Sequence, residues 1–169
     1  MKTAIYPGTF DPVTNGHMDI IDRAGRIFDR VIVTVARNSA KTPLFSAEER
    51  LSLIETVLSE MDSEAKLEVE LFNGLIVDHA ASRKATAIIR GLRAVSDFEY
   101  EFQMALMNRR LSSGITTVFL MPHERYTYLN SSIVREVSSY GGDVSNFVPR
   151  VVEEAIRTKY AHLHGTDGP

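Results

Sequence analysis

The sequence has no cysteine among its 169 residues. This absence excludes a disulfide scaffold, a thiolate metal site and a cysteine nucleophile. It is compatible with a reducing cytoplasm, which is where we expect the protein. Residues 1–6 already form a strand-like pattern with no basic and apolar leader before them, so no export signal is predicted.

Long apolar runs and an excess of basic residues are also missing. The longest apolar runs, such as residues 31–36, are far too short to cross a bilayer. The net charge is −3, whereas proteins that bind nucleic acids usually carry a basic excess. We therefore expect neither a membrane nor a nucleic acid as partner. A small anionic ligand is still compatible with this charge, because a few local cations can hold it.

The chain has the length of one domain and an ordinary globular composition, with 44% hydrophobic and 24% charged residues. Short β-rich apolar runs alternate with segments of helical period, which predicts an α/β fold with a mainly parallel sheet. Several runs are apolar at consecutive positions, as expected of strands that are buried on both faces. The five expected strands are residues 3–6, 31–35, 67–71, 87–89 and 117–120.

Six helices are expected between and after these strands. Ser46 and Glu49 have the spacing of a capping box, and Ser96 and Glu99 repeat it before a helix over residues 97–111. The apolar residues of that helix cover too wide an arc for one buried stripe, so a subunit interface or deep burial must cover it. The other helices are expected over residues 14–28, 75–82, 132–139 and 150–161.

The sharpest motif is a strand, then Tyr6-Pro-Gly-Thr-Phe-Asp-Pro-Val-Thr-Asn-Gly-His17, then a helix. Open parallel sheets bind ligands beyond the carboxyl ends of their strands, and a helix N-terminus offers free N–H groups to phosphate. Gly16 lets the backbone come close to such an anion, and His17 can point at it. The alternative is an ordinary strand–helix turn with an incidental histidine.

Further cations follow other strands. Arg90 and Arg93 flank a glycine at the end of the fourth strand, where their planar forks suit phosphate. Surface ion pairs are the alternative for them. Lys41 lies in the loop after the second strand, and simple solvation is its alternative. If the anion site is real, His17, Lys41 and Arg90 must meet at one edge of the sheet.

These motifs resemble a known family. Thr14-Asn-Gly-His17 matches the T/H-x-G-H signature of the nucleotidyltransferase superfamily, and the longer Tyr6–His17 motif is similar to that of bacterial phosphopantetheine adenylyltransferases. The stretch Ile89–Glu101 resembles the RGLR–DFEYE segment of that family. Phe119–Pro122 and Tyr128–Glu136 resemble its C-terminal nucleotide-binding motif. The resemblance covers about residues 3–157.

The resemblance implies a Rossmann-like nucleotidyltransferase domain over residues 1–161, with helices on both faces of the sheet, followed by a flexible polar tail over residues 162–169. It implies transfer of AMP from ATP to 4′-phosphopantetheine in coenzyme A biosynthesis, by direct in-line attack. It also implies a homohexamer, with coenzyme A as a candidate feedback ligand.

Site residues follow from the same resemblance. Catalysis is assigned to Thr9, His17 and Lys41, and the acceptor to Thr9, Lys41, Ile76 and Arg90. Glu101 has a solvated acid as its alternative, and Ile76 has core packing. The residues expected at ATP are Thr9, Phe10, His17, Gly91, Leu92, Arg93, Glu101, Tyr126, Thr127, Tyr128, Leu129, Asn130, Ser131 and Ser132.

The C-terminal motif departs from the commoner Ile-Ser-Ser-Ser form, because Leu129 and Asn130 stand in place of its first two residues. Asn130 keeps a hydrogen-bonding side chain. Ser131 and Ser132 can bind phosphate oxygens, and helix N-caps are the alternative for them.

The motifs of other nucleotide and metal sites are absent. The sequence has no Walker loop, no Gly-x-Gly-x-x-Gly, no His-Glu-x-x-His and no clustered carboxylate metal cage. We therefore expect no metal site built by the protein, and Mg²⁺ arriving with ATP. The rival functions are another small nucleotidyltransferase, acting on nicotinate mononucleotide or using CTP, and a non-catalytic adenine-nucleotide sensor.

Overall fold

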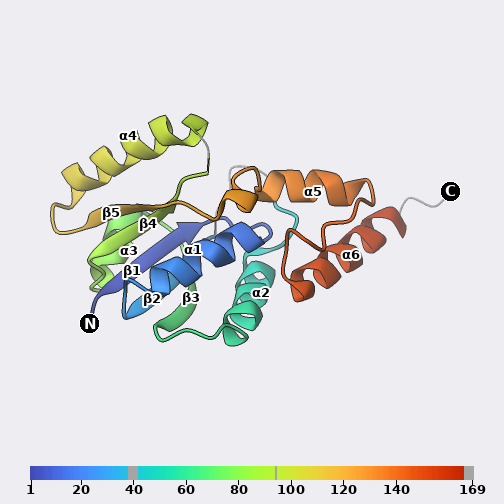
Figure 1. Cartoon of the computed structure of the whole chain (residues 1–169), viewed down its shortest axis with the longest axis horizontal. Coiled ribbons are helices and arrows are strands. Elements are labelled where there is room, and N and C mark those ends of the chain that lie inside the picture. The colour runs from blue at the N-terminus through green and yellow to red at the C-terminus, as the bar shows by residue number, and fades with distance from the viewer. Residues whose placement is uncertain (38–41, 94, 166–169) are drawn as a thin grey trace.

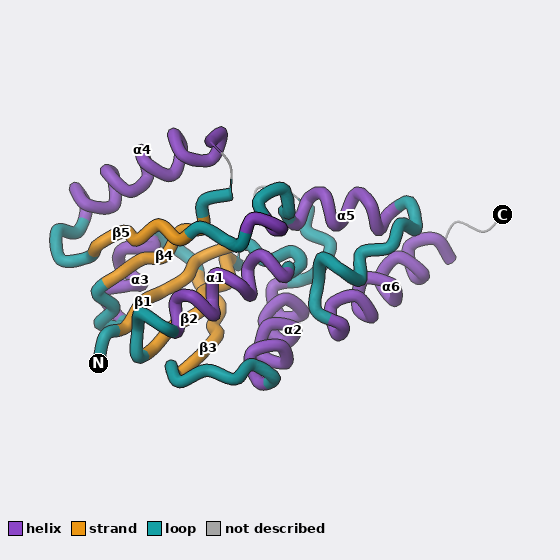
Figure 2. Tube along the Cα trace, viewed as in Figure 1, coloured by secondary structure: helices purple, strands orange, loops and turns teal. Residues whose placement is uncertain are grey.

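Five parallel strands form a single sheet at the centre of the fold in the computed structural model (Figure 1, Figure 2). The structure describes residues 1–37, 42–93 and 95–165. All four strand pairings are parallel, in the order β3-β2-β1-β4-β5, which confirms the expected α/β fold. The strands are β1 (Thr3–Gly8), β2 (Arg30–Ala36), β3 (Lys66–Phe72), β4 (Ala87–Gly91) and β5 (Thr116–Leu120).

Helices follow each strand. The first four connect successive strands, and the last three come after the sheet is complete (Figure 1). They are α1 (Asn15–Gly25), α2 (Ala47–Ser59), α3 (Ile76–Ser82), α4 (Val95–Leu111), the short 3₁₀ helix η1 (Glu124–Tyr126), α5 (Ser131–Ser139) and α6 (Arg150–Gly165).

The two faces of the sheet belong to two separate cores, because side chains alternate along a strand. Ile5, Ile32 and Ile88 pack on one face with Val77 and Ala80 of α3. The neighbouring strand residues point the other way, into a larger core shared with α1, α2, α5 and α6. Helices therefore cover both faces, as expected.

α5 and α6 extend the molecule beyond the carboxyl ends of the strands (Figure 1). Val134 of α5 and Val152 and Ile156 of α6 are buried in the same core as α1 and α2. The helices α5 and α6 therefore lie beyond the edge of the sheet at which the first motif ends.

One expected helix start and one expected helix end are corrected. The Ser46–Glu49 capping box is confirmed, with both reciprocal hydrogen bonds formed. The second expected box is wrong, since α4 begins at Val95 and Ser96 lies inside it. α6 continues to Gly165, so residues 162–165 of the expected tail are helical. Among the described helices, none combines the length and apolar character that a bilayer span requires.

Candidate active site

A cavity of about 420 Å³ opens at the carboxyl edge of the sheet. Every strand contributes to it at or just after its end: Gly8, Ala36, Phe72, Gly91 and Pro122 follow the order β1 to β5. The crevice beyond strand ends is the usual ligand site of open α/β sheets, and strand order reverses here around β1. α1 closes one side of the cavity, and α4 closes another.

His17 is fixed by the start of its own helix. Thr14 is the N-cap of α1, and its hydroxyl accepts the backbone N–H of His17. In return, the backbone N–H of Thr14 donates to Nδ1 of His17 over 3.0 Å. This is a capping box with histidine in the place usually held by Glu or Gln. The spacing of the Thr-x-Gly-His motif therefore has a structural cause.

The same hydrogen bond decides the protonation of the imidazole. Because Nδ1 accepts from a backbone N–H, the ring hydrogen must lie on Nε2. Burial, and then the positive charge of Arg93, lower the pKa of His17 to about 3. His17 is therefore a neutral hydrogen-bond donor at physiological pH, in a cavity that it lines.

Phe10 holds the imidazole from the side. Its ring contacts His17 edge-on, with centroids 5.0 Å apart, and contacts Tyr6 in the same way at 5.4 Å. Phe10 is almost fully buried and has a φ of 50°, which is strained for a residue with a side chain. A Cβ on Gly8 would lie 2.8 Å from this ring, so only glycine fits there.

Arg90 emerges from the end of β4 into the cavity and meets Glu101 of α4. Both oxygens of the Glu101 carboxylate accept from the guanidinium, in a bidentate pair that fixes its plane. Glu101 is buried, and Arg90 is partly buried. The ion pair posed as one alternative for Arg90 is therefore formed, and Arg90 still lines the cavity, so its contact with the acceptor stays a prediction.

Comparison with known proteins identifies the family. Residues 5–137 match the family model described as cytidylyltransferase-like. The phosphopantetheine adenylyltransferase of Geobacter sulfurreducens is 56% identical, with 95% of this chain and 96% of that protein covered. The phosphopantetheine adenylyltransferase of Methylococcus capsulatus is 57% identical, with 94% and 96% covered. The chain belongs to the phosphopantetheine adenylyltransferase family.

More distant proteins share the fold. A solved structure of Plasmodium falciparum nicotinic acid mononucleotide adenylyltransferase, complexed with NaAD, has a TM-score of 0.71 and 14% identity, with 94% of this chain and 96% of that chain covered. At this identity the similarity concerns the Rossmann-like architecture alone.

Eight of the residues predicted from the phosphopantetheine adenylyltransferase motifs line the one cavity: Thr9, His17, Ile76, Arg90, Gly91, Arg93, Glu101 and Leu129. His17 and Arg90 thus meet as expected. Lys41, the third member of that prediction, lies outside the described residues. Ile76 also packs against the smaller core, so its two suggested roles are compatible.

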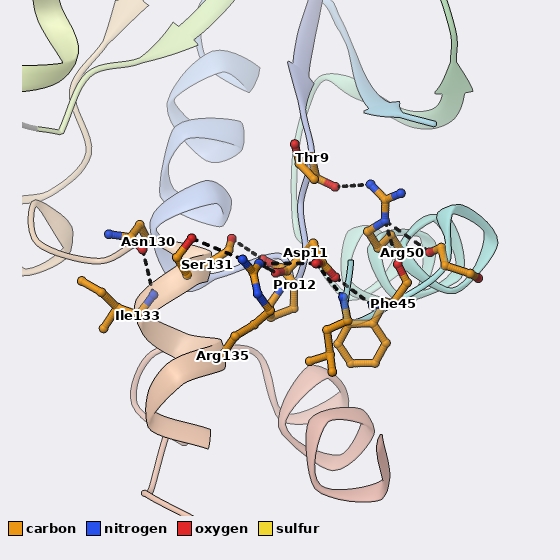
Figure 3. A network of polar contacts seen from close by, with 12 residues as sticks. Thr9, Asp11, Pro12, Phe45, Arg50, Asn130, Ser131, Ile133 and Arg135 are labelled. Atoms are coloured by element: carbon orange, nitrogen blue, oxygen red, sulfur yellow. Dashed lines mark hydrogen bonds and ion pairs between the residues drawn. The ribbon is translucent and has the colours of Figure 1, made fainter. Parts of the chain in front are cut away.

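The segment after η1 is held by hydrogen bonds of its own side chains. Asn130 is the N-cap of α5 and accepts the backbone N–H of Ile133, so this departure from the family motif keeps a capping function. The hydroxyl of Ser131 donates to the carbonyl of Pro12 (Figure 3). Phe10, Leu92, Ser132 and the segment 126–128 do not line the cavity as it stands, and their contact with ATP stays a prediction.

Asp11 joins this segment to the rest of the site (Figure 3). Its buried carboxylate accepts the backbone N–H groups of Leu44 and Phe45, both over 2.9 Å. Arg135 of α5 donates to the same carboxylate and to the Asp11 carbonyl. Asp11 therefore holds together the first motif, the chain before α2 and the helix α5 of the C-terminal motif.

Sequence reasoning named Glu101 but missed the other residues that α4 contributes. Glu101, Met104, Ala105 and Asn108 all line the cavity, and their i, i+3, i+4, i+7 spacing places them on one face of the helix. The polar Asn108 among the apolar residues of this helix was the available signal in the sequence, and the structure shows that it is buried. Tyr6 was missed as well. In the described part of the chain, no three His, Asp or Glu side chains group as a metal site.

Proposed function

We propose that this chain transfers the AMP group of ATP to 4′-phosphopantetheine, giving dephospho-coenzyme A and pyrophosphate. Relatives at 56% and 57% identity, matched over nearly their whole length, carry this activity in their names. The observation that carries the proposal is the presence of a neutral donor, His17, and a fixed guanidinium, Arg90, in one cavity at the strand ends.

In this reaction a phosphate oxygen of the acceptor attacks the α-phosphorus of ATP in line. The new oxygen–phosphorus bond forms as the bond from that phosphorus to the leaving oxygen breaks, and pyrophosphate departs with its electron pair. The attacking phosphate is already an anion, so the step needs no strong general base. Catalysis is then positioning of two anions that repel each other, together with stabilisation of charge on the α-phosphate.

The described residues have distinct tasks in this proposal. His17 donates from Nε2 to the α-phosphate, where a neutral imidazole stabilises the charge of the transition state. Thr9, beside it, binds the reacting phosphates together with Lys41. Arg90 binds the acceptor phosphate, and Glu101 holds the plane of its guanidinium.

The apolar part of the cavity suits the pantetheine arm. Phe72, Ile76 and Met104 line it, on the side of β3, α3 and α4. Arg93 and Leu129 line it near the segment predicted for ATP. Mg²⁺ belongs to the substrate here, since it enters with ATP and keeps most of its waters.

The proposal also includes a homo-oligomer, with the hexamer that the family resemblance implies. Its support is the outer face of α4, where Phe98, Phe102, Leu106, Met107 and Leu111 are exposed. Such a concentration of large apolar side chains on a single helix is typical of a protein interface.

A pyrophosphate-release assay with varied substrates tests the function. We expect release with ATP, Mg²⁺ and 4′-phosphopantetheine, and none with pantetheine, which lacks the attacking phosphate. Faster release with nicotinate mononucleotide, or with CTP in place of ATP, would assign the chain to another nucleotidyltransferase. Binding of ATP without release from any acceptor would identify a sensor.

A further inference from the structure

Arg50 is the largest of the side chains with almost no exposure, with 1% of its surface accessible. It lies in the first turns of α2, behind the cavity, and does not line it. Arginine is rarely buried so completely unless its charge and its donors are satisfied. The hydrogen bonds of Arg50 therefore indicate which structural role its buried charge has.

Four backbone carbonyls receive its hydrogen bonds, among them that of Thr9 (Figure 3). Nη1 donates to the carbonyl of Thr9 over 2.6 Å and to that of Ala36 over 3.0 Å. Nε donates to the carbonyls of Phe45 and Ser46, each over 3.2 Å. A guanidinium suits this arrangement because its donors are spread in a rigid plane.

The carbonyls belong to segments that carry the site. Thr9 directly follows β1 and opens the turn to His17, whereas Ala36 ends the neighbouring strand β2. Both residues line the cavity. Nη1 of Arg50 therefore links the end of β1 to the end of β2 and fixes the distance between them. The reacting phosphates are expected at this point. The Nε contacts attach this point to the start of α2.

We propose that Arg50 is a positioning residue for the adenylyl transfer, acting through Thr9 and the end of β2. The inference rests on the proposed function. Without Arg50 the Thr9 and Ala36 carbonyls lose their shared donor, and the turn relaxes away from the geometry that the reaction needs. A displacement of about 1 Å at such a point can reduce a rate on the order of 10²-fold.

Two variants of the full chain separate positioning from simple stability. Arg50→Met keeps the bulk of the side chain but removes every donor, and Arg50→Lys keeps the charge and part of the hydrogen bonding. We expect kcat to fall about 10- to 100-fold in Arg50→Met, with a smaller change in KM for ATP, and to recover partly in Arg50→Lys. kcat is measured at a temperature where circular dichroism shows each variant folded.

Ile54→Ala is the matched control. Ile54 lies one turn further along α2, is fully buried in the core and does not line the cavity. Its truncation destabilises the same helix by creating a cavity, so a merely structural role for Arg50 predicts the same outcome in both variants. We expect Ile54→Ala to lower the unfolding temperature but to keep the wild-type kcat.

Wild-type kcat in folded Arg50→Met would overturn the inference. If Arg50→Met does not fold, wild-type kcat in folded Arg50→Lys would overturn it equally. An inactive wild-type protein, with ATP and 4′-phosphopantetheine supplied, would instead overturn the proposed function. The two failures are therefore distinguishable in one series of measurements.

Discussion

The imidazole of His17 accepts a hydrogen bond from the residue that begins its own helix, so one contact orients the ring and selects its tautomer. His17→Ala removes the donor from the cavity. We expect kcat to fall on the order of 10²-fold or more, the scale of a lost donor to a developing negative charge. Steady-state pyrophosphate release checks this, with His162→Ala, far along α6, as the histidine control. Ordinary turnover in a folded His17→Ala protein would remove His17 from the chemistry.

The low pKa of His17 also links stability to pH. In the folded protein this pKa is about 3, whereas a histidine in an unfolded chain titrates near pH 6.5. Between these values the unfolded state binds the extra proton, so the free energy of unfolding falls as pH decreases through 6.5. From pH 7 to pH 5 this one group accounts for a loss of up to about 2 kcal/mol.

His17→Gln does not titrate, so its stability should fall less over the same interval. Urea unfolding of both proteins at pH 7 and pH 5 measures the difference. Carboxylates with lowered pKa values, such as Asp19 and Glu68, are present in both proteins and cancel in the comparison. Equal losses in the two proteins would show that His17 is charged in the folded state near pH 5.

At the scale of elements, Gly16 at the start of α1 is a position where a substitution should affect ligand binding but not the stability of the fold. A Cβ on Gly16 would lie 3.5 Å from Cβ of Tyr126 and 3.9 Å from Cδ2 of Leu129, which are ordinary contacts. Gly16→Ala is therefore expected to keep or slightly raise stability, since alanine favours a helix by about 1 kcal/mol over glycine.

ATP affinity should respond differently to Gly16→Ala. The added methyl group lies between the helix N-terminus and the segment predicted for ATP, in a position that lines the cavity. We expect the Kd for ATP, measured by calorimetry, to rise at least tenfold, and the unfolding temperature to stay within a few degrees of the wild type. Unchanged ATP affinity would mean that the nucleotide does not approach the backbone at Gly16.

Several elements were predictable because their signals are local. The Ser46–Glu49 box and the strand–turn–helix motif before His17 depend on residues within one or two turns of each other. Glu101 was predicted from the family motif, but the rest of the cavity face of α4 was not recognised, because Asn108 becomes informative only once β4 and Arg90 are known to face this helix. Asn130 was noticed as a departure, but its capping of α5 depends on where that helix begins.

At the scale of the whole molecule, the order of strands was the step that sequence could not supply. Parallel pairing followed from the alternation of strands and helices, and the meeting of His17 with Arg90 follows from β1 and β4 being neighbours. The family motifs predicted this meeting without that topology. Arg50 carries no motif of its own, since its role depends on carbonyls up to 41 residues away.

The outer face of α4 is the remaining feature that a single chain does not explain. Phe102 and Leu106 are 46% and 45% exposed, one turn apart, on the side away from the cavity stripe. The double variant Phe102→Glu/Leu106→Glu should disrupt the proposed assembly, because burying two carboxylates without partners at an interface costs several kcal/mol. Glutamate at position 106 lies one turn before Arg110, which offsets the like-charge pair that the two new glutamates form with each other at i, i+4.

Light scattering after size exclusion measures the outcome. We expect the wild type to elute as an oligomer, the double variant as a smaller species with the same far-UV circular dichroism, and Gln103→Glu at the wild-type mass. Gln103 is the matched control because it is exposed on the same helix and is already polar. A wild-type mass in the double variant would locate the interface elsewhere, and a monomeric wild type would refute the assembly, leaving the exposed apolar face of α4 to another partner.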